Sequence, residues 1–134
     1  MTKEELKKRT MKFALMVIYV VGKLPNTKAG NTIGNQLIRS GTSVAANYRA
    51  SCRARSIADF ISKITVVEEE CDESLFWLEL TVESRILQEE TIRNILREAN
   101  ELTAIFTASG KTARQNNSRF HNPKSTIQNP KSSG

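Results

Sequence analysis

Apolar residues recur at intervals of three and four along most of this chain, which is the spacing of one face of an α-helix. No run of alternating apolar and polar residues bounded by turn signals predicts a strand. The segment 24–30 predicts a loop, and Ser56 with Asp59 three positions later has the pattern of a helix N-cap. Four helices are therefore predicted, at about 4–24, 31–54, 57–87 and 90–114.

Short connections make consecutive helices antiparallel neighbours, and each predicted helix has one apolar face that can contribute to a shared core. With 39% hydrophobic residues in 134, the chain can form one packed domain of ordinary size. We predict an all-α fold, an antiparallel up-down-up-down four-helix bundle over residues 1–115. Residues 116–134 are rich in Asn, Ser, Lys and Pro, and are predicted to form a flexible, disordered basic tail.

Two of the predicted helices carry more apolar surface than one core face requires. Each large apolar side chain left in water forgoes about 1.5–3 kcal/mol, so a cluster of them favours self-association over scattered surface residues. We expect a homo-oligomer. Its interface is predicted to include Leu15, Ile18, Val66, Phe76, Trp77 and Leu80.

Glu68 is placed on the core face of the third helix, where a carboxylate needs a partner or must stay protonated. Counting back from the turns places Arg9 at about the same height, on the core face of the first helix. We therefore predict a structural buried pair between Arg9 and Glu68. The alternative, a catalytic acid, has no second titratable group visible beside Glu68.

Charge is segmented along the chain. Residues 1–63 have 12 basic and 3 acidic residues (+9), residues 64–110 have 3 and 11 (−8), and residues 111–134 have 5 and none (+5), which sums to the net charge of +6. Within the first segment, a basic stripe lies on the outer face of the second helix. It consists of Arg39, Arg49 and Arg53. Such a stripe is typical of a surface that follows nucleic-acid phosphates, but it is equally suited to pairing with the acidic run 68–73 of the same or a neighbouring subunit.

Composition removes most kinds of catalysis. The single histidine, His121, excludes a His-based triad, a Glu-x-x-His di-iron bundle and a His-ligated zinc centre. Cys52 and Cys71 lack the spacing of a zinc site, and their predicted heights differ by roughly 16 Å, too far for a disulfide. We therefore expect no enzyme activity, no metal and no other cofactor, with both thiols buried and reduced.

A membrane segment is not predicted. The apolar run 13–21 is far shorter than the ~20 residues needed to span a bilayer. Glu4 and Glu5 also lie where a signal peptide would be basic. We expect a cytoplasmic protein with no membrane partner.

Several segments together closely resemble one known family. They are residues 38–50 (Ile-Arg-Ser-Gly-Thr-Ser-Val-Ala-Ala-Asn-Tyr-Arg-Ala), 53–61, 67–80 and 98–112. The chain is identified through them as similar, over about residues 5–115, to the bacterial four-helix bundle family first recognised as reading frames within intervening sequences of 23S ribosomal RNA genes. The resemblance implies a compact bundle that assembles as a ring-shaped homopentamer, and it carries no catalytic residues.

The chain is similar also to the accessory protein of diversity-generating retroelements, which binds nucleic acid and a reverse transcriptase. A reverse transcriptase is thus a partner implied by this resemblance alone. We favour a non-enzymatic oligomeric bundle that binds nucleic acid, structured RNA above all, through Arg39, Arg49 and Arg53. The alternative is a protein–protein scaffold whose charge segmentation serves self-assembly only.

Overall fold

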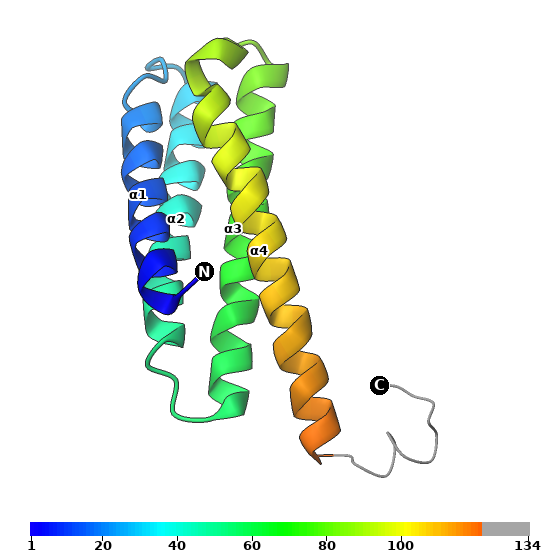
Figure 1. The fold of residues 1–134 in the computed structure, drawn as a ribbon. Coiled ribbons are helices and arrows are strands. Elements are labelled where there is room, and N and C mark those ends of the chain that lie inside the picture. The colour runs from blue at the N-terminus through cyan, green and yellow to red at the C-terminus, as the bar shows by residue number, and fades with distance from the viewer. Residues whose placement is uncertain (122–134) are drawn as a thin grey trace.

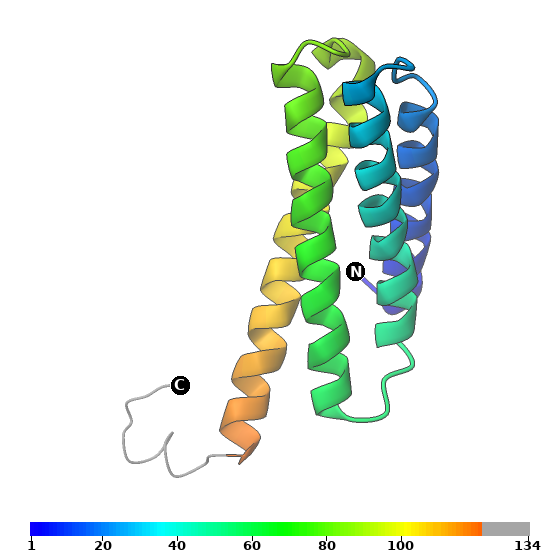
Figure 2. The ribbon, with the colours of Figure 1, turned by 180° about the vertical axis from the view of Figure 1, so that it is seen from behind.

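The computed structural model describes residues 1–121, most of which lie in four helices. These are α1 (Lys3–Val21), α2 (Lys28–Ser51), α3 (Ile57–Glu83) and α4 (Glu89–His121). Consecutive helices run in opposite directions and lie side by side, with the α1–α2 and α3–α4 connections at one end and the α2–α3 connection at the other (Figures 1 and 2). The predicted all-α up-down-up-down bundle is confirmed, and residues 1–121 contain no strand.

Hydroxyl side chains cap the starts of the first three helices. Thr2 and Glu5 form a capping box, in which each side chain accepts a hydrogen bond from the backbone N–H of the other residue. Ser56 caps α3 as predicted. Thr27 caps α2 by accepting a hydrogen bond from the Gly30 N–H, so this helix begins at residue 28 and not at 31.

The later helix ends differ from the prediction. Helix α3 ends at Glu83 because Arg85 takes a left-handed conformation with a φ of 62° just beyond it. Helix α4 is kinked at Ile92 near its start, where φ is −122° and ψ is 17°.

The predicted boundary of the tail is also shifted. Residues 116–121, assigned to the tail, belong instead to α4, because no proline or glycine interrupts the chain between Gly110 and Pro123. The tail predicted from residue 122 onward lies outside the described residues.

One hydrophobic core runs through the bundle. Its largest fully buried side chains include Phe13, Phe106, Leu37, Ile64, Leu78, Ile92 and Leu102. Helix α3 contributes the seam Ile64, Val67, Cys71, Ser74, Leu78 and Thr81. Glu68 was predicted to lie on the core face, but α3 is rotated about its axis so that Glu68 lies at the margin of this seam. This rotation is possible because the buried Ser74 hydroxyl donates a hydrogen bond to the Ser40 hydroxyl of α2, at 2.9 Å.

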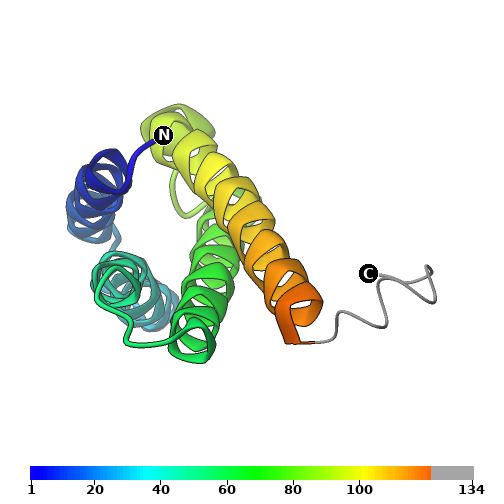
Figure 3. The same cartoon turned by 60° about the horizontal axis from the view of Figure 1, so that its bottom comes forward.

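Helix α4 packs along α3 and touches α1 much less. Viewed from the end that holds the α2–α3 connection, α4 crosses the bundle obliquely and its C-terminal half leads away from α1 and α2 (Figure 3).

Candidate functional site

The three arginines of α2 do not form one set. Arg39 lies between two carboxylates of α3: its Nη1 is 3.2 Å from both oxygens of Glu70, and its Nη2 donates to Glu73. Hydrogen bonds to Glu73 and then Glu70 raise the pKa of Arg39, and the hydrogen bond from Arg39 lowers the pKa of Glu73. Arg39 therefore pairs with the acidic run 68–73, and these ion pairs form within one subunit.

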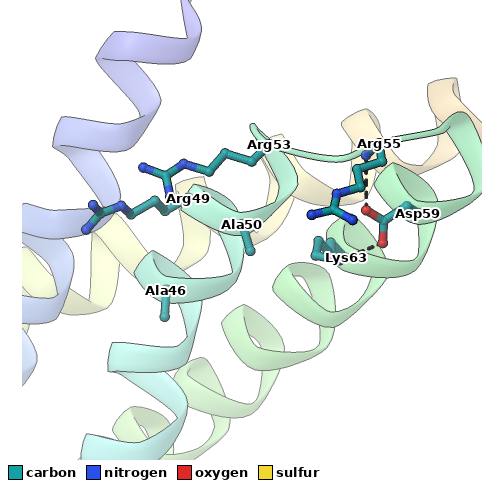
Figure 4. A pocket seen from close by; sticks show the side chains of 7 residues that line it. All are labelled: Ala46, Arg49, Ala50, Arg53, Arg55, Asp59 and Lys63. Atoms are coloured by element: carbon teal, nitrogen blue, oxygen red, sulfur yellow. Dashed lines mark hydrogen bonds and ion pairs between the residues drawn. The ribbon is translucent and has the colours of Figure 1, made fainter.

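Arg49 and Arg53 are exposed, and their guanidinium groups point toward α1 (Figure 4). Neither forms an ion pair with any residue between 1 and 121. On the α1 side they border an open hollow of about 470 Å³. Its lining is Lys7, Lys8, Met11, Lys12, Leu15, Ala45, Arg49 and Arg53. The two arginines thus line the same hollow as three lysines from the first half of α1.

A second open hollow, of about 640 Å³, lies on the other side of the same two arginines. It is lined by Ala46, Arg49, Ala50, Arg53, Arg55, Asp59 and Lys63, which Figure 4 shows. Asp59 accepts hydrogen bonds from Lys63 Nζ at 2.5 Å and from the Arg55 backbone N–H at 3.2 Å. The bond from Lys63, and next that from Arg55, lowers the pKa of Asp59, so this carboxylate is already engaged.

Because both hollows share Arg49 and Arg53, they form one continuous surface, which we call the basic face. It consists of Lys7, Lys8, Lys12, Arg49, Arg53, Arg55 and Lys63. Sequence reasoning missed the lysines and Arg55. The predicted topology could have revealed the lysines, because antiparallel packing places the beginning of α1 beside the end of α2.

The surplus apolar residues divide into two groups. On α1, Leu15 is 59% exposed and Ile18 is 49% exposed, beside exposed Met11 and Tyr19. We call these four residues the α1 strip. On α3, only Phe76 among the four predicted interface residues is exposed, at 52%.

The remaining predicted interface residues of α3 are half-buried. They are Val66, Trp77 and Leu80. Trp77 packs against the core and donates its Nε1–H to Glu73 at 3.2 Å. The α3 surface is therefore less apolar than the spacing suggests.

The predicted buried pair between Arg9 and Glu68 is wrong. Arg9 donates from Nε and Nη2 to both oxygens of Glu98, at 2.7 and 2.9 Å, and from Nη2 to Glu101. Glu68 lies 3.3 Å from Arg114 of α4. The reason is the turned seam of α3, which directs Glu68 toward α4 instead of into the core.

The two cysteines differ in burial. Residues 1–121 contain no group of three or more His, Cys, Asp and Glu side chains that could hold a metal ion. Cys71 is buried, and burial raises its pKa to about 12, whereas Cys52 is half-buried; both are free. Over the same part of the chain, no helix is long and apolar enough to cross a membrane.

The fold and surface define a small four-helix bundle with a basic face formed by α1, α2 and the start of α3. The chain belongs to the 23S rRNA-intervening sequence protein family, whose sequence pattern matches residues 2–108. The family predicted from the sequence segments is thereby confirmed.

A solved structure is similar to the chain. It is the crystal structure of a protein with unknown function from the S23 ribosomal protein family of Bacteroides thetaiotaomicron VPI-5482. That protein is 29% identical, with a TM-score of 0.75, and the match covers 83% of this chain and 99% of the other. Curated proteins give no match.

Proposed function

We propose that this protein is a non-enzymatic, oligomeric bundle of the cytoplasm that binds nucleic acid, structured RNA above all, through the basic face. One observation carries the proposal: Arg49 and Arg53 are exposed between two hollows lined by further cations, with no ion-pair partner among residues 1–121. Arginine and lysine donors in such an array suit phosphate oxygens. The family description, which refers to 23S rRNA, agrees with an RNA ligand.

The chemistry of the basic face favours backbone contacts over base reading. No aromatic side chain lines either hollow, so stacking on single-stranded bases has no platform there. Phosphate contacts carry little sequence information, and they release counterions on binding. Binding should be weakly sequence-selective and steeply dependent on salt.

The double variant Arg49→Gln/Arg53→Gln should bind structured RNA more weakly and with a flatter salt dependence. Each lost phosphate contact removes about 0.7–0.9 from the slope of log affinity against log salt, so the pair should remove up to about 1.8. Fluorescence anisotropy over a salt series measures the slope. The matched control is Arg39→Gln, which removes the same charge from a side chain already held by Glu70 and Glu73.

A wild-type protein that fails to bind at low salt would remove nucleic acid from the proposal, and so would a double variant with an unchanged slope. The protein–protein scaffold would then be the better account.

The α1 strip supports the oligomeric part of the proposal and also the scaffold alternative. Its four large side chains are exposed, and lysines of the basic face lie beside it. The outer surface of α3 has the opposite character, with exposed Phe76 among carboxylates. Those exposed carboxylates are Glu69, Asp72, Glu79 and Glu83. A strip of one copy can face the α3 surface of the next, and unlike faces of this kind close into rings or extend as filaments.

Leu15→Glu combined with Ile18→Glu should yield smaller species with unchanged helical content, because both side chains lie outside the core. The two new glutamates would also face the acidic α3 surface of the next copy. Repulsion between them should lower the association constant at least about tenfold. Size exclusion with light scattering measures the mass. Ile57→Glu is the control, since Ile57 is 48% exposed, close to the 49% of Ile18, but lies at the start of α3, away from the strip. A wild type that is a 15.0 kDa monomer at micromolar concentration would contradict self-association.

A further inference from the structure

A hollow of about 900 Å³ lies at the α2–α3 end of the bundle. At this end the backbone of α4 leads away from α1 and α2 (Figure 3). This hollow is larger than the two hollows of the basic face and within the volume range of small-molecule sites. All four helices contribute to it. Its apolar wall consists of Tyr48, Cys52, Ala54, Ile57, Phe60 and Ala113.

The two charged side chains that line this end hollow are both cations. Lys3 and Arg55 contribute cations, and the other polar lining side chains are Ser51, Ser56, Asn116 and Asn117. No carboxylate is among the lining residues in the described part of the chain. Burial, and next the neighbouring Cys52, raise the pKa of Tyr48, so its hydroxyl stays protonated at neutral pH and adds no negative charge.

We propose that the end hollow binds a small amphipathic anion, one with an apolar body and a carboxylate or sulfonate head. The body covers the wall of Tyr48, Phe60 and Ala113, and the head lies between Lys3 and Arg55. An inorganic anion would leave that wall uncovered, and a cation would be repelled at the rim. The site shares Arg55 with the basic face but is not lined by Arg49 or Arg53, so its binding can be tested apart from nucleic-acid binding.

Cys52 provides a reporter inside the hollow, and Cys71 an internal control. N-ethylmaleimide is uncharged and should alkylate Cys52, whereas Cys71 is buried and its thiol stays protonated. Decanoate below its micelle concentration should bind in isothermal titration calorimetry. It should also slow Cys52 alkylation severalfold by mass spectrometry, and decylammonium should not.

Two variants locate the site. Ala113→Leu keeps a strong helix former while adding three carbons to the apolar wall of the hollow, and should weaken both decanoate binding and Cys52 protection. Lys3→Gln should weaken decanoate binding by up to about fivefold. Lys28→Gln, at the opposite end of the bundle, should leave it unchanged. Arg55 is kept because it also lines the basic face.

Three outcomes would overturn the proposal. They are the absence of decanoate binding by calorimetry, equal protection of Cys52 by decylammonium, and unchanged decanoate binding by Ala113→Leu. RNA binding by Ala113→Leu should equal that of the wild type. Arg49→Gln/Arg53→Gln should bind decanoate normally, so failure of one site leaves the other still testable.

Discussion

Gly41→Ala should lower the free energy of unfolding by about 1–3 kcal/mol, although alanine is the better helix former. A Cβ at position 41 of α2 would lie 2.6 Å from Cγ2 and 3.0 Å from Cβ of Val17 on α1. Val17 is fully buried, and its branched side chain has few alternative rotamers. The two helices must therefore separate to admit one methyl group, which loosens their contact on both sides of the crossing.

Gly34→Ala is the matched control, seven positions earlier on α2. Its Cβ would meet Val21 at 3.4 Å and Leu24 at 3.5 Å, which is ordinary contact. This variant should be neutral or up to about 1 kcal/mol more stable, because alanine is favoured in helices. Urea denaturation followed by circular dichroism compares the two.

A similar loss at both glycines would show that close packing at Gly41 is not the cause. Adding Val17→Ala to Gly41→Ala should yield a favourable coupling of about 0.5–3 kcal/mol. No coupling would count against the direct contact.

The number of helices and most of the core could be predicted because apolar spacing depends only on helix geometry. The rotation of α3 could not, because apolar spacing gives no reason to place hydroxyl residues such as Ser74 and Thr81 in the core. Both are buried: the Thr81 hydroxyl donates to the Trp77 carbonyl at 2.7 Å, and the Ser74 hydroxyl meets Ser40. Hydroxyls satisfied in this way can replace apolar residues in a seam, and the prediction for Glu68 was wrong for that reason.

The basic face could be predicted only in part. Arg49 and Arg53 lie on the outer surface of α2 as the spacing indicated, and their role in binding stays a prediction. The two interpretations of Arg39 depended on where α3 turns its carboxylates, which single-helix spacing does not determine. Lys8 and Lys12 could not be assigned to the basic face from the spacing within one helix, because this face exists only after α1 and α2 pack together.

Arg9→Leu should lower the free energy of unfolding by about 1.5–3 kcal/mol, because it leaves two carboxylates of α4 without their cation. Glu98 and Glu101 lie one helical turn apart, and both currently accept from Arg9. The side chains of Arg9 and Glu98 are only 23% and 20% exposed, so water cannot fully replace the lost hydrogen bonds. Helix α1 has few other contacts with α4, so this loss should also loosen the seam between them.

Glu68→Ala provides the contrast, because its partner Arg114 is 43% exposed and the pair is longer, at 3.3 Å. Its loss should lower the free energy of unfolding by no more than about 1 kcal/mol, the range of exposed ion pairs. Arg9→Leu/Glu98→Leu should recover much of the stability lost in Arg9→Leu, since the double variant no longer has a half-buried carboxylate at position 98. Chemical denaturation measures the free energy of unfolding of the three variants. A larger loss in Glu68→Ala than in Arg9→Leu would mean that α1 is not held to α4 by Arg9.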